Sequence, residues 1–185
     1  MAGTVNIALA LKRHPESLAS APNRVDARVL RTPEGVLGVI YILDGDLDKL
    51  SLPEARPPRV GNRLWEHSCF ELFIARAGLL GYHEFNFAPS GEWAAYAFAG
   101  YRQAVPVVPE SFAPHIAVRD ADGRFELEAT LQLERLSPGH ASAKLSLSVA
   151  AVIEDKHGAL SYWALKHPPG KPDFHHTDAF MLTLG

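Results

Sequence analysis

Hydrophobic and polar positions alternate along much of the chain, and glycine and proline residues separate the alternating segments. The clearest segments repeat at every second residue or are short apolar runs of β-branched and aromatic residues, which is typical of β-strands. The expected strands are residues 5–11, 24–30, 36–43, 69–74, 82–88, 92–98, 115–119, 125–133, 144–153, 161–165 and 180–184. Many short strands with frequent turns predict an all-β fold, either an antiparallel, jelly-roll-like sandwich or a flattened barrel.

Two proline-containing stretches interrupt this pattern. Residues 44–62 carry three prolines and are expected to form a long surface loop, whereas residues 105–114 are expected to carry the chain from one sheet to the other. Short helices are expected at 62–66 or near 134–136. Without an internal repeat or a sharp boundary, residues 1–185 are predicted to form a single domain.

Composition narrows the classes of partner and the compartment. The 185 residues are 47% hydrophobic and 21% charged with a formal net charge of -3, so no basic excess favours nucleic acid or anionic lipid. Cys69 is the single cysteine, which excludes an intramolecular disulfide and a cysteine-rich zinc site. The amino-terminal segment resembles a first strand and not a signal peptide, and no apolar stretch approaches the roughly 20 residues that span a bilayer. We therefore expect a cytoplasmic protein that binds neither membrane nor nucleic acid.

One face of the central strands is unusually polar. Alternation places Tyr82, Glu84 and Asn86 on the same side of their strand. If the preceding loop folds symmetrically about residues 77 and 78, Glu71 lies directly across from Glu84. Neighbouring carboxylates repel unless a cation, a shared proton or ligand hydroxyl groups offset the repulsion, so a binding site is predicted here. The alternative is a solvated outer face, which antiparallel sheets commonly have.

The carboxy-terminal residues 162–178 gather aromatic, basic, acidic and imidazole side chains around a proline-rich turn. Three interpretations stay open for this stretch. Lys171 and His175 donate hydrogen bonds at the rim of a ligand site, His175 or His176 ties the last strand to a neighbouring loop, or a metal is bound. The metal site would use His167, His175, His176 or Asp173.

Trp65 and Trp163 sit at the edge or entry of strands beside charged residues. Exposed indole rings stack on sugar rings, although a tryptophan packed in the core is the commoner case.

The segments 64–74, 82–93, 162–165 and 171–176 resemble those of DOMON-like bacterial proteins related to family 9 carbohydrate-binding modules. The resemblance covers most of the chain from about residue 36. It implies a β-sandwich with a site for a sugar-type or haem-type ligand on one sheet or at its rim. Trp65, Glu71, Glu84 and Asn86 fall in the region where sugar-binding relatives carry aromatic and hydrogen-bonding groups. Haem-binding relatives use a methionine and a histidine, and Met181 is the candidate methionine in this chain.

Together these observations predict a non-catalytic domain that binds a small polar ligand, a carbohydrate or polyol. The predicted ligand-binding residues are Trp65, Glu71, Glu84, Asn86, Trp163, Lys171 and His175. Glu71 and Glu84 would accept hydrogen bonds from hydroxyl groups, and Asn86 would both donate and accept them.

Three alternatives of other classes are kept open. An enzyme acting on a sugar-like substrate would use Glu71 and Glu84 as an acid/base pair assisted by His175, with or without a metal. A haem-binding domain would rely on Met181. A partner-binding sandwich would pair an exposed edge strand with another chain. The sequence predicts neither a cofactor nor an oligomeric state.

Overall fold

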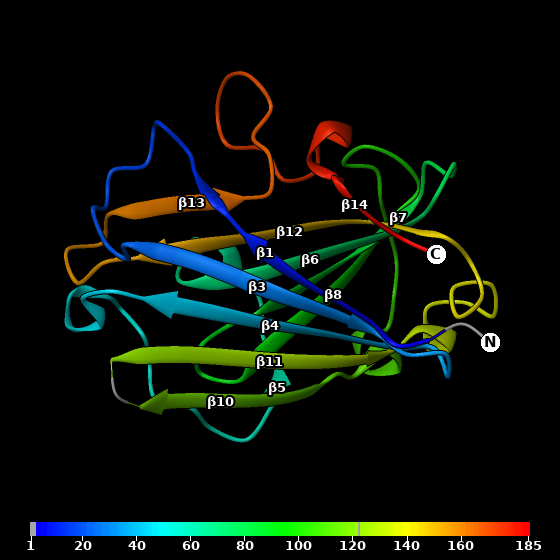
Figure 1. Cartoon of the computed structure of the whole chain (residues 1–185), viewed down its shortest axis with the longest axis horizontal. Coiled ribbons are helices and arrows are strands. Elements are labelled where there is room, and N and C mark those ends of the chain that lie inside the picture. Colours follow the sequence, from blue (N-terminus) through cyan, green and yellow to red (C-terminus); the bar gives the residue numbers. More distant parts are fainter. Residues whose placement is uncertain (1–2, 122) are drawn as a thin grey trace.

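The computed structural model describes residues 3–121 and 123–185, whose strands form two sheets packed face to face (Figure 1). One sheet has five strands in the order β1-β3-β4-β11-β10, and all its pairings are antiparallel. Its strands are β1 (Val5–Ala10), β3 (Arg24–Arg31), β4 (Val36–Asp44), β10 (His115–Ala121) and β11 (Arg124–Gln132).

The second sheet has nine strands, seven of them in the order β2-β13-β12-β6-β7-β8-β5. In addition, β14 pairs with β12 and β9 with β8, and within the described residues the parallel pairing of β5 with β8 is the sole exception to an antiparallel arrangement. Its strands are β2 (Lys12–Arg13), β5 (Arg59–Val60), β6 (Cys69–Arg76), β7 (Tyr82–Phe87), β8 (Glu92–Phe98), β9 (Ala104–Val105), β12 (Leu145–Glu154), β13 (Leu160–Ala164) and β14 (Leu182–Leu184).

The remaining regular elements are single turns of 3-10 helix. They are η1 (Leu47–Lys49), η2 (Leu64–Glu66), η3 (Pro109–Phe112), η4 (Leu133–Arg135) and η5 (Thr177–Ala179). In the described part of the chain, no helix has the length and apolarity needed to cross a membrane.

The all-β sandwich predicted from the alternation is confirmed, and each of the eleven predicted segments contains a strand. The two short helices expected near 62–66 and 134–136 are the 3-10 turns η2 and η4. The segment 105–114 does lead from the nine-stranded sheet to the five-stranded sheet. The pattern missed β2, β5 and β9, because two residues are too few to show a period.

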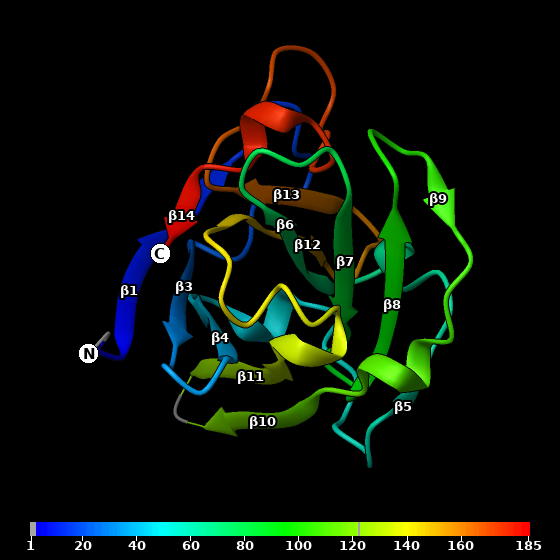
Figure 2. The ribbon, with the colours of Figure 1, turned by 90° about the vertical axis from the view of Figure 1, so that its right-hand side faces the viewer.

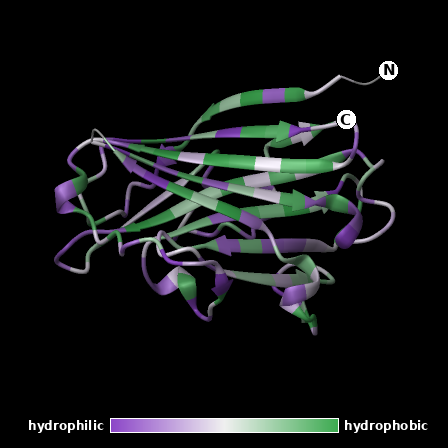
Figure 3. Cartoon of the chain, turned by 90° about the horizontal axis from the view of Figure 1, so that it is seen from below, coloured by the Kyte–Doolittle hydropathy of each residue, from purple (hydrophilic) through white to green (hydrophobic). Residues whose placement is uncertain are grey.

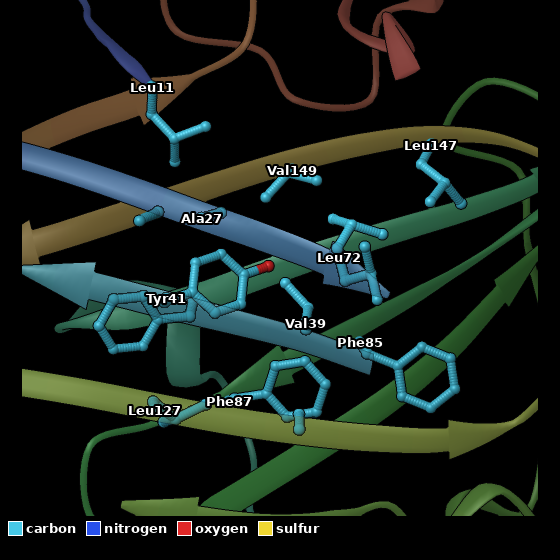
Figure 4. Packing of buried hydrophobic residues seen from close by; sticks show 14 of the residues in the cluster. Leu11, Ala27, Val39, Tyr41, Leu72, Phe85, Phe87, Leu127, Leu147 and Val149 are labelled. Atoms are coloured by element: carbon cyan, nitrogen blue, oxygen red, sulfur yellow. The ribbon is translucent and has the colours of Figure 1, made fainter. Parts of the chain in front are cut away.

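The main core lies between the sheets and consists of the inward-facing residues of both (Figure 4). Figure 3 shows hydrophobic and hydrophilic bands alternating along the strands, as period-two burial requires. Tyr41, Phe70 and Phe125 are fully buried and pack as one aromatic column, with ring centroids 5.0 and 5.8 Å apart. The Tyr41 hydroxyl donates a 2.7 Å hydrogen bond to the main-chain carbonyl of Glu71, which fixes β6 against the five-stranded sheet.

A second, smaller hydrophobic cluster lies on the other side of the nine-stranded sheet. Phe73, Tyr82 and Phe174 belong to its buried part, with Phe98 and Phe180 packed against them. Phe174 and Phe180 come from the carboxy-terminal segment, which lies over this sheet on the side away from the five-stranded sheet (orange to red in Figure 2). The carboxy-terminal segment therefore covers one region of the sheet's outer face, and the polar residues of the central strands lie beside this cover.

Candidate functional site

The outer face of the central strands carries the polar residues that alternation predicts. Phe70, Leu72, Phe85 and Phe87 point into the main core, so Glu71 and the alternate residues of β7 point outward. The predicted register is wrong, however, because Glu71 pairs with Asn86 and Glu84 pairs with Phe73. The two glutamates are diagonal neighbours on adjacent strands and not directly opposite.

The loop between β6 and β7 explains this two-residue difference. The Leu79 amide donates to the Arg76 carbonyl (3.0 Å), and Gly78 adopts φ +83 within this tight turn. Leu80 and Gly81 then lengthen the loop on the β7 side only, so the hairpin is not symmetric about residues 77 and 78.

A pocket of about 440 Å³ opens above these strands, a size suited to a small molecule. Glu71 and Glu84 lie on its floor and are only 4% and 5% exposed. Its remaining lining is mainly aromatic. These residues are Trp65, Tyr96, Phe98, Arg102, Val152, Tyr162, Pro172, Phe174 and His175.

Glu84 is held by two neighbours. The Asn86 amide group donates a 2.9 Å hydrogen bond to Glu84 Oε1, while His175 Nε2 lies 3.6 Å from Glu84 Oε2. The other ring nitrogen of His175, Nδ1, lies 2.9 Å from the Tyr82 hydroxyl, which accepts a hydrogen bond from the Arg102 amide (3.2 Å). A hydroxyl that accepts one hydrogen bond keeps its own proton to donate, and when Tyr82 donates to Nδ1 the imidazole proton is on Nε2, facing Glu84.

Burial dominates the electrostatics of this floor. It raises the pKa of Glu84 from 4.5 to about 7, although the Asn86 hydrogen bond and Arg102 act in the opposite direction. The pKa of Glu71 is also raised well above its usual value, first by burial and then by the charge of Glu84. Burial and Arg102 lower the pKa of His175 to about 4, so its imidazole is neutral near pH 7. A carboxyl group is thus available in both protonation states at neutral pH.

The turn after β8 is joined to the carboxy-terminal segment by a polar clamp. Arg102 donates from its guanidinium to Asp173 Oδ1 (2.9 Å), and the Tyr101 hydroxyl donates to Asp173 Oδ2 (2.6 Å). Asp173 Oδ1 also accepts from the main-chain amide of His175 (3.1 Å). The clamp therefore positions the imidazole over the pocket floor.

The structure brings four of the seven predicted residues together in the pocket lining, namely Trp65, Glu71, Glu84 and His175. Asn86 is fully buried on the same face and contacts the site through Glu84. Trp65 is 41% exposed and meets Tyr96 edge to face, with ring centroids 5.8 Å apart.

Two predicted residues lie elsewhere. Trp163 packs in the main core, where its indole Nε1 donates to Ser161 Oγ (3.0 Å), so its assignment to the ligand site is corrected. The alternation of β13 turns its neighbour Tyr162 toward the pocket instead. Lys171 is exposed and lines an adjoining hollow, which shares Tyr162 and Pro172 with the pocket, so Lys171 itself is outside the pocket lining.

The histidines proposed as metal ligands have separate partners. His167 Nε2 lies 2.7 Å from the Lys12 carbonyl, and His176 Nδ1 accepts from the Asp178 amide (3.1 Å). Among residues 3–121 and 123–185, no three histidine, cysteine or acidic side chains come together as a metal site. Met181, the candidate haem ligand, is 57% exposed and lies outside the pocket lining.

The sequence pattern did not identify several lining residues, including Tyr96, Phe98, Arg102, Tyr162 and Phe174. Tyr96 and Phe98 were accessible in principle, because they alternate with Ala94 and pair with Glu84 and Tyr82 across the hairpin. Arg102 occupies a left-handed position (φ 54) that no periodicity marks.

Comparison with known proteins supports the architecture. No family model and no curated protein matches the chain. A solved structure from Bacteroides uniformis, described as a "putative carbohydrate-binding protein", is similar over 94% of this chain and 84% of that chain, with a TM-score of 0.65 and 13% sequence identity. At this identity the likeness establishes a shared fold alone, a β-sandwich.

Proposed function

We propose that residues 1–185 act as one DOMON-like binding domain whose pocket holds a small carbohydrate or polyol without transforming it. The observation that carries this proposal is the combination of a floor with two buried carboxyl groups and walls of aromatic rings. Carboxyl groups accept hydrogen bonds from hydroxyls, and aromatic faces pack against the C–H surfaces of a sugar ring.

Two further observations favour the same proposal. The Bacteroides uniformis protein with this fold carries a carbohydrate-binding description. The resemblance of segments 64–74 and 82–93 to DOMON-like proteins concerns the strands that form the pocket floor. A cytoplasmic location stays a prediction from the amino-terminal sequence.

Trp65 offers a direct test of this site, because it lines the pocket whereas Trp93 and Trp163 are buried in the main core. We expect a panel of mono- and disaccharides, titrated by calorimetry and tryptophan fluorescence, to include ligands that Trp65→Ala binds about fivefold more weakly, since an aromatic contact is worth about 1 kcal/mol.

The matched control is Trp163→Phe, which removes an indole from the core and should leave the affinity within about twofold. The ligand is recovered after the titration and examined by NMR. A binding domain is expected to leave it chemically unchanged. Chemical conversion that Glu84→Gln abolishes would replace binding by acid/base catalysis, and failure of every sugar to bind would refute the proposed function.

A further inference from the structure

The Glu71 carboxyl group has no hydrogen-bond partner among the described residues, although the side chain is 4% exposed and lines the pocket. Asn86 Oδ1, on the same face, is likewise buried and unpartnered in this part of the chain. Of these two residues only Glu71 lines the pocket, so a ligand that brings hydrogen-bond donors to the floor would be favoured there, because an unpartnered buried acceptor is costly.

Positive charge to balance the two glutamates is scarce at the floor. The Arg102 guanidinium lines the pocket, but it is paired with Asp173 and its side chain is 53% exposed. His175 is the other basic group in the lining, and with a pKa of about 4 it supplies no charge at neutral pH. Glu71 and Glu84 therefore lie diagonally on adjacent strands, and the cation whose charge acts on both, Arg102, is itself paired with Asp173.

The walls suit an organic cation better than a metal ion. Trp65, Tyr96 and Tyr162 offer aromatic rings around the acidic floor, and ring faces attract ammonium groups through their quadrupole. A metal ion would instead need oxygen or nitrogen ligands, and the described residues contain no cluster of three such side chains.

We propose that the pocket selects ligands that carry a protonated amino group, with amino sugars as the class of carbohydrate bound, and that the ammonium sits between Glu71 and Glu84. This inference rests on the proposed carbohydrate-binding function and adds a charge requirement to it. The hydroxyl groups of the sugar pack among the aromatic walls, and the ammonium supplies the three donors that the floor lacks.

The experiment compares glucosamine, glucose and N-acetylglucosamine by calorimetry at about pH 6.5, where an amine of ordinary pKa is charged. These three sugars share a ring, and only glucosamine carries a charge. We expect glucosamine to bind at least about tenfold more tightly than the two neutral sugars, as a charge-assisted contact to a buried carboxylate implies. Binding of the cation ionises Glu84, so protons are released and the measured enthalpy changes with the ionisation enthalpy of the buffer.

Glu71→Gln and Glu84→Gln test the residues themselves, because the carboxamide keeps the shape of the side chain and cannot ionise when the cation binds. Each is expected to reduce the ratio of glucosamine to glucose affinity to about one, whereas the control Glu128→Gln, an outward-facing residue of the other sheet, retains the tenfold ratio. The buffer dependence is measured on the unaltered protein, so the test does not depend on the variants folding.

Equal affinity for the three sugars, without proton release, would overturn the charge requirement while leaving carbohydrate binding in place. Displacement of glucosamine by millimolar calcium would also overturn it in favour of a metal site. If none of the three sugars nor the wider panel binds, the proposed function itself is refuted.

Discussion

The outer faces of the two sheets follow the same alternation but have different environments. On β11 of the five-stranded sheet, Glu126 and Glu128 are partly exposed, and Glu126 pairs with Arg124 at 2.8 Å. On β7 of the nine-stranded sheet, Glu84 and Asn86 occupy equivalent outward positions yet are buried. The carboxy-terminal segment and the turn after β8 cover the second face and leave the first to solvent. A strand's own pattern thus places a carboxylate on an outer face, while distant segments decide whether it is solvated or becomes part of a site.

The largest expected effect concerns the outward-facing apolar residues of the two sheets. Phe73 points away from the main core but is fully buried under the carboxy-terminal segment, whereas Ile40 is an outward residue of the five-stranded sheet and is half-buried. We expect Phe73→Ala to lower the free energy of unfolding by about 4 kcal/mol and Ile40→Ala by about 1 kcal/mol, because only the former leaves a closed cavity. Urea denaturation measures both values, and similar losses would mean that the cover does not form a second core.

The second effect concerns the buried carboxyl group of Glu84 and the direction in which its contribution to the free energy of unfolding changes with pH. Because the folded-state pKa of Glu84 is raised from 4.5 to about 7, the stabilisation from its proton is fully present below pH 4.5 and is lost as the pH rises through 7. The carboxamide of Glu84→Gln does not titrate, so the variant has no such loss. We therefore expect its stability relative to the unaltered protein to increase from pH 5 to pH 8, by as much as roughly 3 kcal/mol.

The control for this pH dependence is Glu128→Gln, whose stability difference from the unaltered protein should change by less than about 0.5 kcal/mol over the same range. His175 and His140 have pKa values lowered to about 4, so their contribution is lost on acidification as the pH falls through 4, and both remain in each protein compared. A pH-independent difference for Glu84→Gln would show that this carboxyl group is solvated, like those of the other sheet.

The sequence predicted which residues lie on the same face of a strand better than it predicted which residues pair across neighbouring strands. Alternation placed Glu84 and Asn86 on one face of their strand, because side chains change sides at every residue, and the assumed pairing across the loop added Glu71 to that face. It did not determine the register, which depends on the asymmetric loop at Gly78, nor the choice between Tyr162 and Trp163 on β13. A shift of one residue exchanges the two faces of a strand, and here both candidates were aromatic.

The cover over the site was less predictable than its floor. The composition of residues 162–178 indicated a polar, aromatic loop, and His175 was identified from it. Its contact with Glu84 depends, however, on the packing of a segment about ninety residues away in the chain, and on Arg102 in a left-handed turn. Long-range contacts of this kind leave no periodic signal in the sequence.

The smallest expected effect concerns the clamp that holds the cover in place. Arg102 and Asp173 are paired at 2.9 Å, but the guanidinium side chain is 53% exposed, so solvent screening reduces the value of the contact. A double-mutant cycle with Arg102→Gln and Asp173→Asn should give a coupling of about 0.5 kcal/mol in the free energy of unfolding. The same variants are expected to speed amide hydrogen exchange in residues 173–176 more than in β11, because the five-stranded sheet has no cover to release. If the substitutions changed the exchange rates of both regions equally, aromatic packing on Phe73 and Tyr82 would hold the carboxy-terminal segment without the clamp.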